Sequence, residues 1–171
     1  PLYSSAASDV YKRQTWNKKA RFDGSQQTFP KLMRDHGYET ALIGKWHLGT
    51  TPTGFDYFDV MSGQGKYYNP SLNRGDIEGV QETRTVKGHN SNVVADLSID
   101  WLKNGRDKEK PFLLMAQFKA THHGWAPAPE EYELYEEVVV PEPDNLFDDF
   151  STRGTATVSY THLTLPTNRE V

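Results

Sequence analysis

Residues 37–49, GYETALIGKWHLG, place the strongest constraint on how this chain can fold. In them a short apolar run ends in a lysine, a tryptophan and a histidine. Side chains two residues apart in an extended segment point to the same face, and the one between them points to the other. Lys45 and His47 are therefore expected to project together at the end of a buried strand, with Trp46 packed behind them. A fixed positive charge beside a group that titrates near neutral pH suits chemistry on an anion.

Two segments have the spacing of amphipathic helices. In residues 25–36, apolar side chains recur at positions i, i+3 and i+4, Ser25 is a candidate N-cap, and Gly37 stands where a helix-ending glycine belongs. The second helix is expected from residue 90 or 91 to about residue 104. Its predicted apolar face consists of Val93, Val94, Leu97, Trp101 and Leu102.

Two apolar runs of strand length, residues 40–44 and 112–118, alternate with these helices. The second is expected to be a central strand, because strands buried on both faces are apolar throughout. Residues 51–84 are rich in Gly, Pro, Asn and Tyr, and we interpret them as a long functional loop with short strands in it. Strands that alternate with helices predict a layered α/β fold.

A second place for chemistry follows the apolar run 112–118. His122 and His123 stand just beyond it, and ligands of open α/β sheets bind beyond the carboxyl ends of strands. Adjacent side chains do not share a face, so we expect no joint metal site for the two histidines. On the residues alone, surface histidines in a polar loop are the favoured interpretation, and a functional histidine is the alternative.

Composition argues against two classes of partner. The net charge is −4 and there is no basic stripe, so a nucleic-acid binder is not expected. No run of about 18 apolar residues is present, so no membrane span is predicted. Residues 130–149 hold nine carboxylates, but without a D-x-D-x-D-G pattern we interpret them as a solvated face rather than a metal site. The oligomeric state is not determined by the sequence.

Residues 37–49 resemble the second signature of the type I, formylglycine-dependent sulfatases, which hydrolyse sulfate esters. The resemblance extends upstream through RFDGSQQTFPKLMRDHGYET, and downstream through TGFDYFDVMSGQGKYYNP, KPFLLMAQFKATHHGWAPAPEEYELY and VVVPEPDNLFDDFSTR. It implies an α/β fold with a partial alkaline-phosphatase-like mixed sheet flanked by helices. The matching signature positions are Gly37, Tyr38, Thr40, Gly44, Lys45, Trp46, His47, Leu48 and Gly49.

The two ends resemble something else, the translated sequencing-adapter read-through found at the edges of metagenomic reading frames. Residues 4–14 read SSAASDVYKRQ and residues 158–171 read VSYTHLTLPTNREV. We therefore expect residues 1–14 and 158–171 to be non-native tails that are set aside before fold reasoning. Residues 15–157 are then expected to be an internal fragment of a sulfatase catalytic domain.

The resemblance implies roles for four residues in a mechanism that begins from a hydrated formylglycine held against Ca²⁺. Lys45 would neutralise developing charge on the sulfuryl oxygens, and His47 would take a proton as sulfate is released. His122 would contact the sulfate and donate a proton to the leaving alcohol. Trp125, in the same loop, would contribute to substrate binding.

The nucleophile and metal ligands that the resemblance implies are missing from the sequence. It contains no cysteine, and no serine stands in the C/S-x-P-S-R motif from which formylglycine is made. The family's paired Asp ligands, its Asp-Asn pair and its second Lys are missing too. We expect the fragment to provide no metal ligands, to hold neither Ca²⁺ nor formylglycine, and to be inactive.

Residues 63–70, GQGKYYNP, and the loop around Trp125 resemble the branch of the family that acts on sulfated sugars. The parent is therefore expected to be a carbohydrate sulfatase, acting on a small-molecule or glycan sulfate ester in the periplasm or outside the cell. Four aromatic residues either line a sugar site or pack an irregular segment. They are Tyr57, Phe58, Tyr67 and Tyr68.

Two other functions stay open. One is another hydrolase of the alkaline-phosphatase superfamily, such as a phosphatase or phosphonate hydrolase, which would share the fold and much of the site. The other is a non-catalytic, glycan-binding member of the fold.

Overall fold

The computed structural model describes residues 21–144, 152 and 154. The expected tails, residues 1–14 and 158–171, lie outside the described residues. The chain divides into two compact units, Pro1–Tyr132 and Glu133–Val171. All helices and strands discussed below belong to the first unit.

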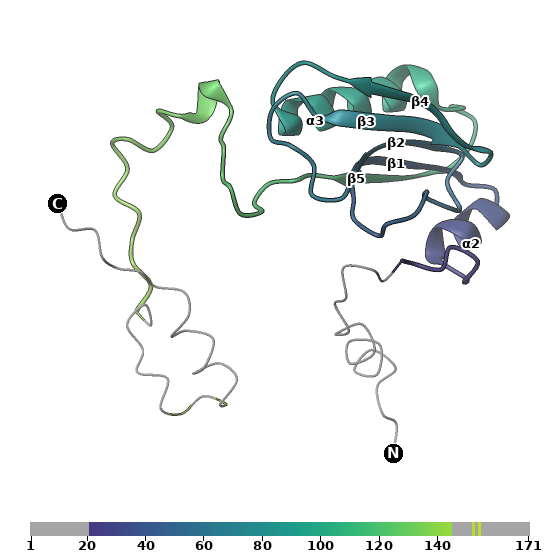
Figure 1. Cartoon of the computed structure of the whole chain (residues 1–171), viewed down its shortest axis with the longest axis horizontal. Helices are drawn as coiled ribbons and strands as arrows, with labels where there is room; N and C mark the ends of the chain where they lie inside the picture. The colour runs from purple at the N-terminus through teal and green to yellow at the C-terminus, as the bar shows by residue number, and fades with distance from the viewer. Residues whose placement is uncertain (1–20, 145–151, 153, 155–171) are drawn as a thin grey trace. The chain divides into compact units, whose positions relative to one another are not determined.

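A five-stranded mixed sheet forms the centre of the first unit (Figure 1). Strand β1 runs parallel to β2 on one side and to β5 on the other, whereas β3 and β4 form an antiparallel hairpin next to β2. The carboxyl ends of β1, β2 and β5 therefore meet at one edge of the sheet. In spatial order the strands are β4 (Gly79–Thr85), β3 (Ser71–Asp76), β2 (Tyr57–Ser62), β1 (Glu39–Trp46) and β5 (Phe112–Gln117).

Helix α3 (Asn90–Asp100) covers one face of the sheet and continues into a π-helical turn, Trp101–Gly105. The predicted apolar face is confirmed: Val93, Val94 and Trp101 are buried against the sheet, and Leu97 and Leu102 pack beside them. Among the residues that the structure describes, the other helical elements are α2 (Phe29–Asp35) and the short 3₁₀ turn Pro129–Glu131. Within the described part of the chain, no helix is long and apolar enough to cross a membrane.

Helix α2 is shorter than predicted. It begins at Phe29 rather than Ser25, with Thr28 as the residue before its first turn. Proline is tolerated only in the first turn of a helix, so Pro30 fixes the start close to itself. Ser25 instead closes a local turn, in which its backbone N–H donates to Asp23 Oδ1 at 2.9 Å. Gly37 follows the helix with φ of +85°, as the sequence predicted.

Residues 51–84 contain the short strands that the sequence predicted, β2, β3 and most of β4. These strands pair into the central sheet, so most of the segment is not a loop. The run 112–118 forms β5, as expected, but in the strand order of the described sheet β5 is the outermost strand on one side rather than a central strand. An apolar run reports burial of the strand's faces and carries no information about neighbours along the hydrogen-bonding direction.

One carboxylate, that of Asp59, is buried in the sheet. Asp59 on β2 has no exposed surface. Its Oδ1 accepts a hydrogen bond from Arg84 Nη1 at 3.1 Å, and Arg74 Nε lies 3.8 Å from its Oδ2. Tyr57 Oη donates to the same Oδ2 at 3.3 Å. The burial of this charge is therefore compensated by two guanidinium groups and a hydroxyl.

We expect Gly44→Ala to lower the free energy of unfolding by roughly 3–5 kcal/mol, through overpacking combined with backbone strain. Gly44 on β1 pairs with Gln117 on β5 and has φ of +113°. A Cβ atom there would stand 2.0 Å from the Gln117 carbonyl oxygen. Urea unfolding of the 171-residue chain measures the loss.

Gly63 is the matched control. It also has positive φ, +68°, but nothing lies within 4 Å of a Cβ placed on it. Gly63→Ala should therefore cost only about 1–2 kcal/mol, the left-handed penalty alone. Equal losses in the two variants would show that the close approach of β5 is not what requires glycine at position 44.

Candidate active site

Lys45 reaches the carboxyl edge of the sheet from β1. Its ammonium Nζ donates to the side-chain oxygen Oε1 of Gln64 at 2.8 Å. Gln64 lies in the turn that follows β2. Burial lowers the pKa of Lys45, and the positive charge of Lys119 lowers it further. None of the ion pairs found among the described residues involves Lys45, so the segment presents a cation with a neutral partner.

The expected alternation of side chains around Lys45 is present. Ile43, two residues earlier, is buried on the α3 side of the sheet. Trp46 packs on the opposite face with the smaller core of Leu42 and Phe58, and its indole N–H donates to the Thr50 carbonyl. His47 follows the end of β1 and is exposed.

His122 lies in the loop after β5 and is exposed. Its backbone carbonyl accepts a hydrogen bond from Tyr67 Oη at 2.6 Å. Its ring Nδ1 lies 3.1 Å from the carbonyl oxygen of His123. A carbonyl can only accept, so Nδ1 carries the proton in this contact. Nε2 is then the ring nitrogen that is left to contact a ligand or to exchange a proton.

Trp125 is 70% exposed on the same loop. Its indole N–H donates to the Thr121 carbonyl at 3.0 Å. Its ring centroid lies 5.1 Å from that of His123. These two contacts are within the loop and leave most of the indole surface open to a ligand.

Tyr67 and Tyr68, in the segment after β2, contact the His89 ring, and hydrogen bonds from Tyr68 and His89 reach the loop after β5. His89 stacks on Tyr67 with ring centroids 5.9 Å apart and meets Tyr68 edge-on at 5.1 Å. Its Nε2 donates to the Ala126 carbonyl at 2.8 Å, and Tyr68 Oη donates to the Pro127 carbonyl at 2.6 Å. Both tyrosines therefore make packing and hydrogen-bonding contacts, as does Tyr57, and Phe58 is fully buried in the core.

Three residues at this edge were not assigned a role from the sequence: Gln64, His89 and Lys119. Lys119 is 7% exposed, and its Nζ donates to the Gln64 backbone carbonyl at 3.0 Å. A lysine directly after an apolar strand and three residues before His122 was a usable signal. Gln64 and His89 gave none, since their contacts come from segments distant in sequence.

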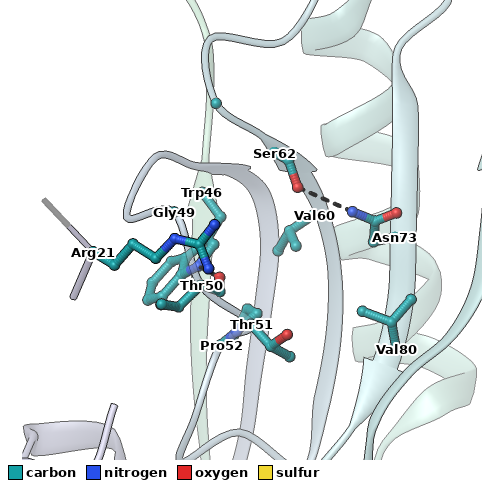
Figure 2. A pocket seen from close by; sticks show the side chains of 11 residues that line it. Arg21, Trp46, Gly49, Thr50, Thr51, Pro52, Val60, Ser62, Asn73 and Val80 are labelled. Atoms are coloured by element: carbon teal, nitrogen blue, oxygen red, sulfur yellow. Dashed lines mark hydrogen bonds between the residues drawn. The ribbon is translucent and has the colours of Figure 1, made fainter. Parts of the chain in front are cut away.

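The two cavities found near this edge are not lined by the candidate residues Lys45, His47 and His122. One, of about 460 Å³, lies on the Trp46 side, where Asn73 Nδ2 donates to Ser62 Oγ at 3.0 Å (Figure 2). The other, of about 520 Å³, lies beside Tyr68. The candidate active site is therefore the open surface at the strand ends rather than either cavity.

The described residues do not fit a catalytic calcium site. None of their histidine, aspartate and glutamate side chains form a group of three or more that could hold a metal ion. Hard cations such as Ca²⁺ require several oxygen ligands together. We therefore assign no metal ligand and no metal-dependent step to these residues.

Comparison with known proteins identifies the fold and the family. The Sulfatase family model matches residues 3–161. An N-acetylglucosamine-6-O-sulfatase of Bacteroides thetaiotaomicron is 45% identical over 138 residues, covering 79% of this chain and 24% of the relative. The human N-acetylglucosamine-6-sulfatase is 29% identical over 140 residues, covering 75% of this chain and 24% of the relative.

A solved structure of a protein in complex with its substrate, D-glucosamine-2-N,6-O-disulfate, has the same arrangement, with a TM-score of 0.71 and 41% identity. The match covers 86% of this chain and 29% of that chain. The structural neighbours share the alkaline-phosphatase-like fold, so the predicted fold class is confirmed. The chain spans about a quarter of the length of the curated relatives it matches. Because the Sulfatase family model matches residues 3–161 and the Bacteroides relative is 45% identical, the chain belongs to the sulfatases, a family of sulfuric ester hydrolases.

Proposed function

We propose that this chain is part of a carbohydrate sulfatase that removes a 6-O-sulfate from N-acetylglucosamine or a closely related glucosamine. The observation that carries the proposal is the 45% identity to the Bacteroides N-acetylglucosamine-6-O-sulfatase over 138 residues. The 41% identical structure that binds a 6-O-sulfated glucosamine supports the same class of substrate. The longer protein implied by this proposal is called the parent sulfatase below.

In this proposal Lys45 stabilises charge on the sulfuryl oxygens. Its ammonium lies at the carboxyl edge of the sheet, next to neutral Gln64 and close enough to Lys119 for that charge to lower its pKa. A preorganised cation in a partly desolvated position is worth more to a developing anion than one in water. His47 follows on the same strand end and exchanges a proton with the reacting group.

His122 is proposed as the acid that protonates the leaving sugar oxygen. The Nδ1 contact with the His123 carbonyl fixes the tautomer, and Nε2 then delivers its proton from the imidazolium form. The Tyr67 hydroxyl holds the His122 backbone in place. Trp125 is proposed to bind the sugar, because its exposed indole offers an apolar face on the same loop as His122.

Formylglycine and Ca²⁺ are implied for the family in general. The proposal assigns them to the parent sulfatase and to none of the residues described here. We also propose that the parent acts outside the cytoplasm, because polyanionic glycans do not cross a lipid bilayer unaided. Cell fractionation with an antibody to this chain tests that location.

The first functional prediction concerns the substrate. The parent sulfatase should release sulfate from 6-O-sulfated N-acetylglucosamine at least about 10-fold faster, in kcat/KM, than from the 3-O-sulfated isomer, because hydrogen bonds to sugar hydroxyls discriminate strongly. The 171-residue chain alone should release none. Ion chromatography of sulfate measures both. Faster release of phosphate from the matching phosphate ester would favour a phosphatase instead.

Removing either basic group on the β1 end should slow the chemical step. Lys45→Ala and His47→Ala are each expected to lower kcat of the parent about 10²-fold or more, typical of losing charge stabilisation or proton transfer. Lys108→Ala is the matched control, since Lys108 is an exposed lysine in the turn before β5 begins. Its steady-state kinetics should equal those of the wild type, and a comparable loss there would refute a specific role for Lys45.

The role of His122 makes a different prediction, because it depends on the leaving group. His122→Ala should lower kcat on a sugar sulfate by about 10²-fold or more and leave an aryl sulfate with a nitrophenolate leaving group nearly unaffected, since that group needs no proton. His123→Ala should change neither substrate's kcat appreciably. If His123→Ala gives the leaving-group-dependent loss, the two histidines have been assigned in the wrong order.

A further inference from the structure

Lys119 is a buried cation whose partners are all neutral. Its side chain is 7% exposed, its Nζ donates to the Gln64 backbone carbonyl at 3.0 Å, and the same nitrogen lies 4.8 Å from the centroid of the Tyr67 ring. No ion pair with Lys119 occurs among residues 21–144. Burying an ammonium is costly unless its hydrogen bonds are satisfied, so Lys119 depends on residues 64–67 for its compensation.

The segment that compensates Lys119 also holds Lys45. Gln64 accepts from Lys119 through its backbone carbonyl and from Lys45 through its side-chain Oε1, at 3.0 and 2.8 Å. One residue therefore lies between two ammonium groups that repel each other. A shift of the Gln64 backbone away from Lys119 also displaces the base of the side chain that contacts Lys45.

The same segment is bound to the His122 loop. Tyr67, whose ring faces the Lys119 ammonium, donates its hydroxyl to the His122 carbonyl at 2.6 Å. Residues 64–67 thus make contacts to the end of β1 and to the loop beyond β5. Lys119 lies two residues after β5 and ties this segment to that strand end.

We propose that Lys119 is a positioning residue of the sulfatase site, holding residues 64–67 so that Gln64 orients the Lys45 ammonium toward the sulfuryl group. This inference rests on the proposed function, since it assigns Lys45 to the sulfuryl oxygens. Lys119 acts through Gln64 and does not itself contact substrate. The two ammonium groups, neither with a carboxylate partner in the described part of the chain, leave local charge that an anion would balance.

The test uses the parent sulfatase with Lys119→Met, which keeps an unbranched side chain of nearly the same length and removes its charge. Losing one charged hydrogen bond predicts about a 10-fold fall in kcat, with KM changed less than about threefold. The alkaline limb of the pH profile should move upward, because removing the Lys119 charge raises the pKa of Lys45. Lys119→Arg should retain most of kcat, and Lys108→Met is the control.

A double-mutant cycle tests the route through Gln64. Gln64→Leu should lower kcat similarly, and adding Lys119→Met to it should cost little more, because both variants remove one interaction chain. Additive losses would overturn the positioning role. So would a rise in KM at unchanged kcat, which would make Lys119 a substrate contact, or kinetics of Lys119→Met that match Lys108→Met.

Folding and function are separated by two further measurements. If Lys119→Met does not fold by circular dichroism, Gln64→Leu and Lys119→Arg decide between the outcomes above. Hydrogen exchange at the amides of residues 64–67 should be about 10-fold faster in Lys119→Met than in Lys108→Met; equal rates would overturn the anchoring. A parent with no sulfatase activity would overturn the proposed function, whereas an active parent that is insensitive to Lys119→Met overturns this inference alone.

Discussion

The pairing of β1 with a parallel strand on each side is the constraint on which the site depends. Because β2 and β5 both run parallel to β1, their carboxyl ends and that of β1 open onto one edge of the sheet. Lys45 ends one strand, Gln64 follows the second and Lys119 follows the third. Three segments far apart in sequence can therefore meet in hydrogen bonds of about 3 Å. Gly44 allows this by letting the β5 backbone approach where any Cβ would collide with it.

Two buried charges, Asp59 and Lys119, are compensated in different ways. We infer that one contributes to stability and the other to the chemistry of the site. The buried Asp59 is surrounded by Arg84, Arg74 and the Tyr57 hydroxyl, so its charge is neutralised inside the fold. Within the described part of the chain, the buried Lys119 contacts a carbonyl and an aromatic face and forms no ion pair. A neutralised carboxylate contributes specific packing and has no field to offer a ligand. A cation balanced only by dipoles keeps much of its field, which is useful when the substrate is an anion.

Features that depend on local periodicity could be predicted from the sequence. The opposite directions of Ile43 and Trp46 follow from strand alternation, and the buried face of α3 follows from helical spacing. The start of α2 differs from the expected Ser25 because Pro30, which is tolerated only in the first turn, determines where the helix begins. The edge position of β5 was not predictable, because strand order depends on contacts between residues dozens of positions apart.

The contacts that join the site segments were invisible for the same reason. Tyr67 meets His122 across 55 positions in the sequence, and His89 meets Ala126 across 37. No local pattern marks a glutamine whose two oxygens serve two lysines. The signature residues Lys45 and His47 could be identified from the sequence because they are close together in it, at the end of one strand. Their environment was not, since it is built by a segment and a loop that the sheet brings together.

The residue proposed to act in the reaction, Lys45, and the residues proposed to contact the sugar are held by different parts of the fold. Lys45 is carried by the sheet itself, where flanking strands fix the backbone on both sides. His122 and Trp125 lie on a loop that accepts hydrogen bonds from Tyr67 and Tyr68, in the segment after β2, and from His89, just before α3. A change in that loop can alter the surface offered to a sugar while β1 keeps the Lys45 backbone in place. Conversely, a change at Lys119 acts on Lys45 through Gln64 without touching the exposed indole. In the proposed carbohydrate sulfatase, this division would let the β1 end keep one reaction while changes in the loop alter which sulfated sugar is bound.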